Sequence, residues 1–439
     1  MAKRASASVL SLLLVLAALP PSVRAQSPTD NGAGSEIVPK NQMPPGVPET
    51  KDETPAALRW MLRPLKHGML VRLPVVDTDP NRGVTYGVMP ILVVTDDAGR
   101  IRQIHAPSLT YNDHFRFSPT YRYYWYPQED ASLVARVSWA KFEHEVMGQY
   151  EDSSFLGSPY RVLLRGQLNA DAGQRFFGVG PDSPQSAEAN YKQEYWQYRW
   201  AFGAPLKDGS PWSARVSQRY MSSRILDGPI PGLPDFHTAF PKQFADRSQQ
   251  TNETRLSVDY DTRDHAVTTE RGAYLDVFAE SAVEGFLSAY SYRRYGTDAR
   301  WFKPWPKDPS EVFAVQLQYE QILGPTPPFW ILPQLGGKYS LRAYGDGRYT
   351  DRGMTALNVE QRIKLAERKT AGVTTEFQLA PFAGVGTVFD SPGEMAARYL
   401  RPVVGAAIRA VAKPQVVGSV DFGVGREGLA IFTDINYSF

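Results

Sequence analysis

The chain has 439 residues, and its 48 basic and 46 acidic side chains leave a net charge of +2, so charge gives no argument for nucleic-acid binding. It contains no cysteine, which excludes disulfides and sites built on thiolates. Mean hydropathy is −0.36, and beyond the N-terminal segment no apolar stretch approaches the length of a membrane helix. Composition therefore excludes a helical membrane protein.

The N-terminus has the layout of a secretory signal peptide. Lys3 and Arg4 precede an apolar run over residues 5–19, and a small-residue motif ends at Ala25. We predict a signal peptide over 1–25 and hence an exported chain; the alternative, an anchor helix, needs roughly 20 apolar residues. An exported chain that crosses a bilayer without helices must form a closed β-barrel, because hydrocarbon offers no partner to free backbone groups.

A segment without periodicity follows the expected cleavage site. Residues 26 to about 57 are rich in Pro, Ser, Asn, Glu and Lys, a composition typical of disordered linkers. We therefore predict a Pro-rich periplasmic linker over 26–65 and an outer-membrane β-barrel over 66–439.

From about residue 82 onward, apolar and polar residues alternate with a period of two, as in strands whose two faces have different surroundings. A soluble sandwich shows the same alternation in a single strand, but the number and length of the segments favour a membrane barrel. Aromatic residues make up 12% of the chain, which suits interfacial girdles, although a sugar-binding β-protein could show the same.

The prediction is an all-β fold, a transmembrane antiparallel β-barrel of about 16 strands. Segment 132–150 is long enough to contain a second strand or a bend. Long connections at 227–252 and 324–353 alternate with short ones, as expected of extracellular loops and periplasmic turns. The expected strands lie near 82–95, 101–112, 115–126, 132–150, 160–170, 189–205, 211–225, 253–263, 271–284, 290–304, 311–323, 354–367, 372–389, 401–411, 414–425 and 428–439.

The final segment alternates strictly up to its last residue. Leu429, Ile431, Tyr437 and Phe439 fall on one face, and an aromatic end on the apolar side suits a strand that ends at a lipid–water interface. We predict that Tyr437 and Phe439 belong to the terminal strand that closes the barrel.

Three stretches carry a resemblance to a known family: LGGKYSLRAYGDGRY (335–349), TALNVEQRI (355–363) and PFAGVGTVFDS (381–391). In this order, ahead of three final strands, the chain resembles the BamA/TamA superfamily of outer-membrane barrels, also called bacterial surface antigens. The resemblance implies a sixteen-stranded barrel in the bacterial cell outer membrane, with a long extracellular loop folded into the lumen.

The family's loop tip is an Arg-Gly-aromatic motif, which matches Arg342, Ala343 and Tyr344 here. Ala343 replaces the usual glycine, and alanine disfavours a positive φ, so we expect a tip of somewhat different shape. We assign Gly336 and Gly337 to the same loop tip as Ala343.

In the family the tip arginine pairs with acidic residues on the inner wall. One matching position is Glu360, and the other is Gly384, which has no carboxylate. We expect Arg342, Tyr344 and Glu360 to form a lumen lock, with Asp390 as one candidate for a second acid. Independently of the resemblance, an arginine carried into a barrel needs a partner, and a carboxylate is the best one.

The resemblance also bears on function. Insertases of this superfamily carry periplasmic POTRA domains, but residues 26–65 are too few for even one such domain, so we expect a member without them. The expected role is protein or lipid transport or assembly at the outer membrane; the alternative is a passive pore or structural barrel. The expected partners are outer-membrane lipids and lipopolysaccharide and the barrel-assembly machinery for its own insertion, with a separate periplasmic protein as a further candidate.

The sequence gives little support for catalysis or metal binding. The chain has no Gly-x-Ser-x-Gly motif, and its histidines have no metal-site spacing, so we expect no enzyme activity, metal or cofactor. The acidic run DTRDHA (261–266) invites a calcium site, but Asp is also a common turn residue, which we prefer. The six histidines are His67, His105, His114, His144, His237 and His265.

Overall fold

The computed structural model describes residues 62–439 except 98–99, 129, 309, 371–372, 413–415 and 435–436. The expected signal peptide and most of the expected linker therefore lie outside the described residues. Within the described part of the chain, no helix is both long and apolar enough to cross a membrane.

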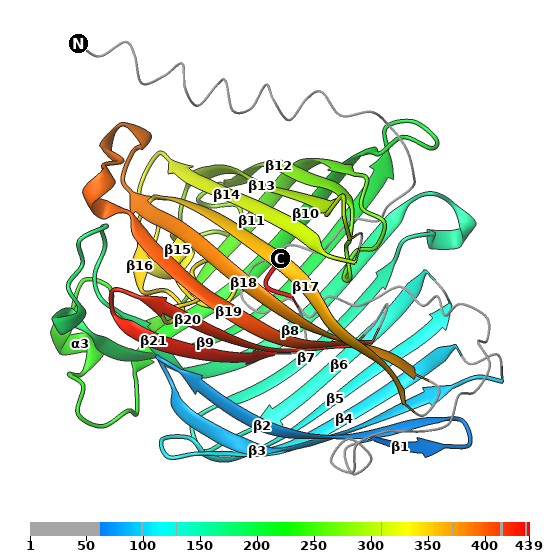
Figure 1. Cartoon of the computed structure of the whole chain (residues 1–439). Coiled ribbons are helices and arrows are strands. Elements are labelled where there is room, and N and C mark those ends of the chain that lie inside the picture. Colours follow the sequence, from blue (N-terminus) through cyan, green and yellow to red (C-terminus); the bar gives the residue numbers. More distant parts are fainter. Residues whose placement is uncertain are drawn as a thin grey trace.

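Antiparallel strands close into one barrel, as predicted (Figure 1). Each strand pairs with the next along the chain, and β21 pairs with β2 to close the ring. A further strand, β1 (Leu62–Leu65), lies outside the ring and pairs with β2. The barrel strands are β2 (Gly68–Asp79), β3 (Gly83–Thr95), β4 (Ile101–Asn112), β5 (Arg116–Gln128), β6 (Ala131–Trp139), β7 (His144–Asp152), β8 (Arg161–Phe176), β9 (Ala189–Pro205), β10 (Trp212–Asp227), β11 (Ala245–Asp261), β12 (Gly272–Ala282), β13 (Tyr292–Pro304), β14 (Val312–Leu323), β17 (Gly353–Thr370), β18 (Val373–Phe389), β19 (Arg401–Ala412), β20 (Val416–Gly425) and β21 (Gly428–Asp434).

The barrel has 18 strands rather than about 16. One of the two extra strands arises because 132–150 is a hairpin, β6 and β7, whose turn at 140–143 lacks the Gly and Pro that mark most turns. The other is β2, which contains Pro74. Proline lacks a backbone N–H and so argues against a strand in a sequence pattern, although a strand at the edge of a sheet accepts it.

The two faces of each strand follow the predicted alternation. On β8, Leu164 and Leu168 point outward and are 52% and 55% exposed, whereas Gln167 between them is buried on the lumen side. On β11, Leu256 faces outward and Glu253 is buried inside. This apolar exterior and polar interior is the arrangement of a barrel in lipid.

The connections at the two ends of the barrel differ in length. At one end, called the loop end, they include 177–188, 228–244, 324–352 and 390–400. At the other, called the turn end, most are short, such as 206–211 and 305–311. Short elements lie in these connections, namely η1 (Phe155–Gly157), η2 (Gln185–Ala187), α3 (Phe236–Ala239), η3 (Phe329–Ile331), β15 (Gln334–Leu335), β16 (Tyr349–Thr350), η4 (Pro392–Glu394) and η5 (Ala397–Tyr399).

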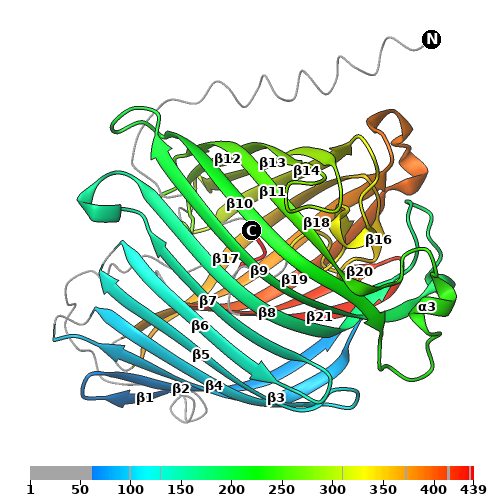
Figure 2. The ribbon, with the colours of Figure 1, turned by 180° about the vertical axis from the view of Figure 1, so that it is seen from behind.

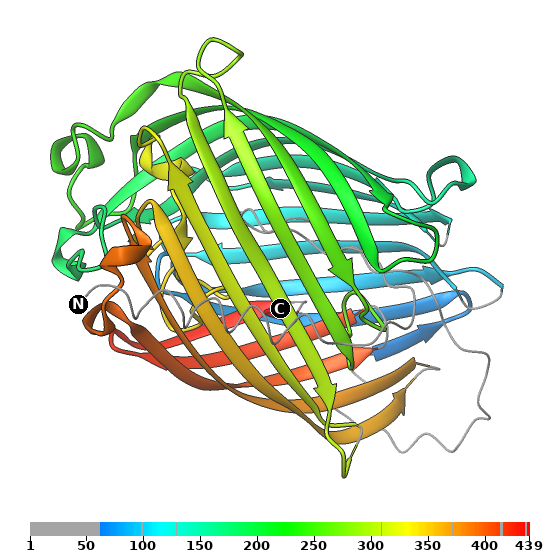
Figure 3. The same cartoon turned by 90° about the horizontal axis from the view of Figure 1, so that it is seen from above.

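An apolar cluster joins two of the long connections to the inner wall. Phe329 in η3 and Phe236 in α3 pack on Phe176 and Tyr191, and the ring centroids of Phe176 and Phe329 lie 4.3 Å apart. Figure 3 shows the segment that contains η3, in yellow, at the loop end of the barrel. The loop after β14 therefore enters the barrel on an apolar anchor.

Candidate functional site

The segment between β15 and β16 is a compact turn of chain inside the barrel. The two strands pair with each other, and the backbone N–H of Gly337 donates to the carbonyl of Tyr344 at 2.8 Å. Gly336 has a φ of 132°, and a Cβ there would stand 2.1 Å from the carbonyl oxygen of Gly345. Glycine is therefore required where the loop begins its turn.

Arg342 at the loop tip lies against the inner wall with its side chain 1% exposed. Its Nη1 atom is 2.8 Å from Oε2 of Glu360 on β17 and 3.1 Å from Oδ2 of Asp421 on β20. Its guanidinium also stacks 3.6 Å from the ring centroid of Phe382. The structure thus brings the predicted pair together.

The second carboxylate is Asp421, not Asp390. Asp390 lies at the loop end and pairs with Arg352 at 3.4 Å. Asp421 on β20 faces Arg342 from a position 79 residues further along the chain. The family position at Gly384 lacks an acid, and Asp421 supplies the missing charge from a different strand.

Glu360 accepts hydrogen bonds from three arginines. Besides Arg342, it accepts from Arg409 at 2.5 and 2.8 Å and from Arg362 at 3.0 Å. The group carries three positive and two negative charges when Asp421 is included, all of them buried. Removing one member of such a buried network leaves charges uncompensated, which typically costs about 3–5 kcal/mol.

Ala343 fits the tip because its backbone is not left-handed. Among the described residues, the non-glycine positions with positive φ are Arg116, Leu156 and Leu287, so alanine meets no strain at 343. The close approach is provided by β20 instead: a Cβ on Gly423 would lie 1.6 Å from the carbonyl oxygen of Arg342. The loop tip rests directly on the backbone of the penultimate strand.

Tyr344 fills the space next to Arg342. It is buried in a cluster with Leu335, Leu341 and Val403. Its hydroxyl accepts a hydrogen bond from the backbone N–H of Arg426, in the turn between β20 and β21, at 3.2 Å.

A second anchor of the loop was missed in the sequence. The Nε atom of Arg348 is 2.7 and 2.9 Å from the carboxylate oxygens of Glu427, in the β20–β21 turn. Its Nη1 atom donates to the carbonyl of Ser183 at 3.1 Å, and the N–H of Gly180 donates to Thr350 at 2.9 Å. No local signal predicts these contacts, because each partner comes from a distant connection.

Where the loop returns to the wall, a buried carboxyl has an altered proton affinity. Burial raises the pKa of Asp351 to about 6 from its ordinary value of 3.8, although the carboxyl accepts a hydrogen bond from the N–H of Arg352 at 2.8 Å. Asp351 is therefore held partly protonated in mildly acidic solution.

The last residues enter the lumen instead of extending the wall. β21 ends at Asp434, and Tyr437 and Phe439 are only 6% and 7% exposed. Arg362 donates to the carbonyl of Phe439 at 2.8 Å and stacks 3.9 Å from the ring centroid of Tyr437. The prediction that Tyr437 and Phe439 close the barrel in the terminal strand is corrected: the lumen arginines draw them inward.

Within the described part of the chain, the seam between the first and last barrel strands has the fewest paired residues of any strand pair in the barrel wall. Among the residues that the structure describes, the pairing register of β2 and β21 contains a single pair, Thr78 with Ile431, supported by a hydrogen bond from the Thr78 hydroxyl at 3.2 Å. By contrast, all 12 residues of β2 pair with β3, and all 7 residues of β21 pair with β20. In Figure 1, β21 in red reaches β2 in blue only at the loop end.

The other candidate residues have ordinary roles. Asp261 pairs with Arg263 at 2.8 Å, and Asp264 accepts turn N–H groups such as that of His265 at 3.0 Å. His105 hydrogen-bonds the Tyr121 hydroxyl at 2.7 Å, in line with an aromatic girdle. Within the part of the chain that the structure describes, no group of three or more His, Asp or Glu residues is arranged to hold a metal.

Comparison with known proteins agrees with this architecture. The model of the Omp85 superfamily domain matches residues 130–417. No curated protein matches the chain.

Among solved structures, the chain is similar to BamA from Haemophilus ducreyi lacking POTRA domains 1–3, with 13% identity, a TM-score of 0.52, and coverage of 83% of this chain and 74% of that one. It also matches CdiB from Acinetobacter baumannii (13% identity, TM-score 0.44, coverage 85% and 60%) and CdiB from Escherichia coli (12%, 0.45, 92% and 66%). At these identities the likeness to BamA shows the fold. Because the family model spans more than half of the chain, and the barrel and lumen loop agree with it, this chain belongs to the Omp85 superfamily and is a β-barrel of the bacterial outer membrane.

Proposed function

We propose that this barrel acts in protein or lipid transport or assembly at the outer membrane, by opening the seam between β2 and β21. The observation that carries the proposal is the single register pair that the described residues form across that seam. A backbone hydrogen bond contributes about 1 kcal/mol net, so a seam with one pair opens at far less cost than any fully paired neighbour.

The contacts of the lumen loop support a role for the loop in controlling that seam. Its tip lies on Gly423 of β20, and Arg348 holds Glu427 in the turn that leads into β21. Arg342 ties the same loop to Glu360 on β17. We infer that the loop fixes the β20–β21 hairpin, and that release of the Arg342 lock would free the seam strand.

A reversible cross-link tests the role of the seam. The chain has no native cysteine, and paired antiparallel residues lie within disulfide reach, so Thr78→Cys with Ile431→Cys should lock β2 to β21. Cells depleted of the wild-type protein are complemented with the locked variant, and the outer-membrane proteins and lipids are then measured. We expect loss of complementation that reductant restores.

The matched control is Ala299→Cys with Leu317→Cys, which joins the fully paired strands β13 and β14. This cross-link should leave complementation intact. Full activity of the oxidised seam variant would contradict the proposal and favour the alternative, a passive pore or structural barrel.

The passive pore has a separate test in conductance. The loop tip and the apolar cluster around Phe329 occupy the lumen, so we expect low conductance in planar bilayers and an increase in Arg342→Ala. A large, steady conductance that the mutation leaves unchanged would favour the pore.

The partners follow from the proposed role. We propose outer-membrane lipids and lipopolysaccharide around the wall, the barrel-assembly machinery for insertion, and a separate periplasmic protein as a further partner. Pull-down from membranes with and without residues 26–57 tests the last of these; equal recovery in both would contradict it.

A further inference from the structure

An apolar patch lies on the inner wall of β2–β7, toward the turn end of the barrel. Strand register joins its members, since Ile104 on β4 lies opposite Val93 and Tyr124, and Tyr124 lies opposite Val134. Figure 2 shows these strands, in blue and cyan, as one continuous part of the wall. The buried members of the patch include Ile91, Val93, Ile104, Tyr124, Tyr126 and Val134.

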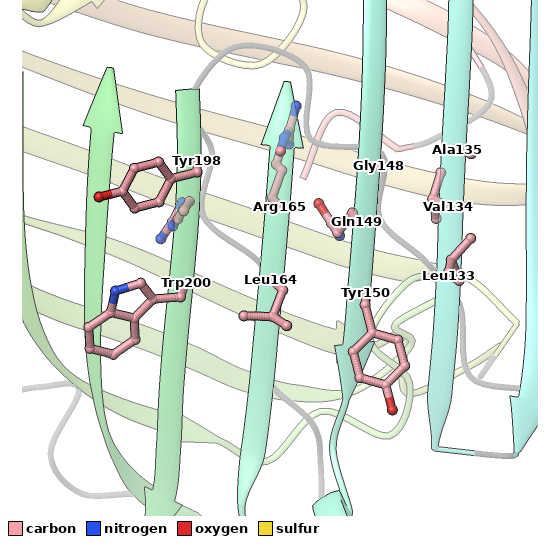
Figure 4. A pocket seen from close by; sticks show the side chains of 12 residues that line it. Leu133, Val134, Ala135, Gly148, Gln149, Tyr150, Leu164, Arg165, Tyr198 and Trp200 are labelled. Carbon is pink, nitrogen blue, oxygen red and sulfur yellow. The ribbon is translucent and has the colours of Figure 1, made fainter. Parts of the chain in front are cut away.

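The patch faces the lumen rather than the lipid. Trp125 points outward and is 41% exposed, whereas its neighbours Tyr124 and Tyr126 are 7% and 2% exposed. Leu133, next to Val134, lines a hollow of about 450 Å³ on the outer face of the wall (Figure 4). Apolar side chains are expected on that outer face, but the interior of a membrane barrel is ordinarily polar. The inner patch therefore needs an explanation of its own.

The wall alone does not account for the burial of the patch. A barrel of this size encloses a lumen too wide for its own side chains to fill, and inward residues of the neighbouring wall, such as Gln197 and Arg219, are partly exposed. The members of the patch that the structure describes all belong to β2–β7, whereas the lumen loop packs in separate clusters on β8–β14 and β17–β19. We therefore looked for another segment that could cover the patch.

The chain enters the barrel beside this patch. Leu62, the first residue that the structure describes, pairs with Val71 on β2. Val71 packs against the patch and lies opposite Ile91, one of its buried members. The residues that precede Leu62 are thus tethered at the edge of the patch.

The sequence just before Leu62 is apolar and has a matching length. Residues 56–61 read AALRWM, whereas residues 49–54 read ETKDET. An extended chain spans at most about 3.3–3.6 Å per residue, so six residues reach about 20 Å. Neighbouring strands lie about 4.7–4.9 Å apart, which places β6 about 19 Å from β2 across the wall. Residues 56–61 are therefore long enough to cross the patch from Val71 to Val134.

We propose that residues 56–61 dock on the apolar patch of β2–β7 inside the lumen and cover it. Docking removes the apolar side chains of Leu58, Trp60 and Met61 from water together with the patch. The tether at Leu62 gives the segment an effective concentration in about the millimolar range, an advantage that a segment of another molecule lacks. The docked segment narrows the lumen from the turn end. This inference goes beyond the proposed assembly role and does not depend on it.

The reactivity of a thiol placed in the patch tests the docking. The chain has no native cysteine, so Val134→Cys in the purified protein in detergent provides a single thiol at a position that is 1% exposed. We expect this thiol to react slowly with a water-soluble maleimide. Replacing residues 56–61 by a Gly-Ser stretch of equal length should raise the labelling rate at least about tenfold, because protection is lost with the cover.

The matched control replaces residues 49–54, a charged stretch of the same length, by the same Gly-Ser sequence, and labelling of Val134→Cys should stay slow. Gln197→Cys, partly exposed on the inner face of β9, should react rapidly with and without residues 56–61. The double variant Leu58→Ser with Trp60→Ser should also raise the rate at Val134→Cys, which covers the case in which the full replacement fails to fold.

Several results would overturn the docking. Rapid labelling of Val134→Cys in the otherwise unaltered chain would mean that the patch is open, and equally slow labelling with and without residues 56–61 would mean that something else covers it. Protection that disappears on dilution of the protein would assign the patch to a second copy of the chain. Protection that depends on the detergent used would assign it to a bound amphiphile.

Discussion

Two regions of the inner wall both contain arginines, but the arginines are buried in one region and partly exposed in the other. On the loop-covered wall, formed by β17–β21, Arg362 and Arg409 converge on Glu360 together with Arg342 of the lumen loop, and all three arginines are buried. On the open wall, formed by β8–β10, Arg165 faces Arg199 across the ladder with a part of each side chain exposed. The difference shows that the alternation of a strand determines which side chains point into the lumen, whereas cover by the loop determines whether those side chains are buried in an ion-pair network.

The largest expected effect removes the shared carboxylate of the loop-covered wall. Glu360→Gln leaves three buried arginines with one acid fewer, and we expect the free energy of unfolding to fall by about 3–5 kcal/mol. Urea unfolding in detergent measures it. Glu194→Gln, on the outer face, is the control and should change stability by less than about 1 kcal/mol; equal losses would show that the loop-covered wall is not special.

A buried acid in the loop gives the next effect, through pH. The pKa of Asp351 is raised from 3.8 to about 6 in the folded protein, so the folded state binds the proton more tightly than the unfolded state. Its stabilisation is full below about pH 4 and is lost as the pH rises to about 6, by up to about 3 kcal/mol.

Asp351→Asn should remove this part of the pH dependence. The measurement is the difference in unfolding free energy between wild type and variant at several pH values from 4 to 7, which cancels the titration of other groups. Parallel curves would show that burial of Asp351 does not alter its proton affinity.

The contact of the loop tip with β20 is tested by two glycines of that strand. A Cβ on Gly423 would meet the Arg342 carbonyl at 1.6 Å, whereas a Cβ on Gly418 has nothing within 4 Å. Gly423→Ala should therefore cost about 1–3 kcal/mol through overpacking and increase protease cleavage in 336–349. Gly418→Ala should be neutral or slightly stabilising; a similar loss in both would mean that only strand propensity is being measured.

The sequence predicted the barrel well because the alternation of a strand is local. The expected segments 101–112 and 189–205 coincide with β4 and β9. The turn at 140–143 was missed because it is closed by backbone hydrogen bonds, such as Ala140 to Glu143 at 2.7 Å, without glycine or proline. Local patterns thus fail where the backbone alone makes the turn.

Of the residues around the lumen loop, only those within the family motifs could be predicted from the sequence. Arg342 and Glu360 stand out in the resembling stretches, but Asp421 and Glu427 reach the loop from 79 residues away. The inward path of Phe439 depends on Arg362 on another strand. Such partners are set by barrel closure, which brings distant strands together and leaves no trace in the local pattern.

The smallest expected effect lies on the open wall. Arg165 is partly exposed, and its Nη2 atom donates to the uncharged Oε1 of Gln167 at 3.0 Å, so we expect Arg165→Gln to change the free energy of unfolding by less than about 1 kcal/mol. Because salt screens partly exposed charges, this change should shrink as ionic strength increases. The loop-covered wall makes a different prediction, since Arg342→Gln breaks a buried network and should destabilise at any salt concentration. A loss of stability in Arg165→Gln as large as that in Arg342→Gln would mean that the two walls differ in exposure but not in kind.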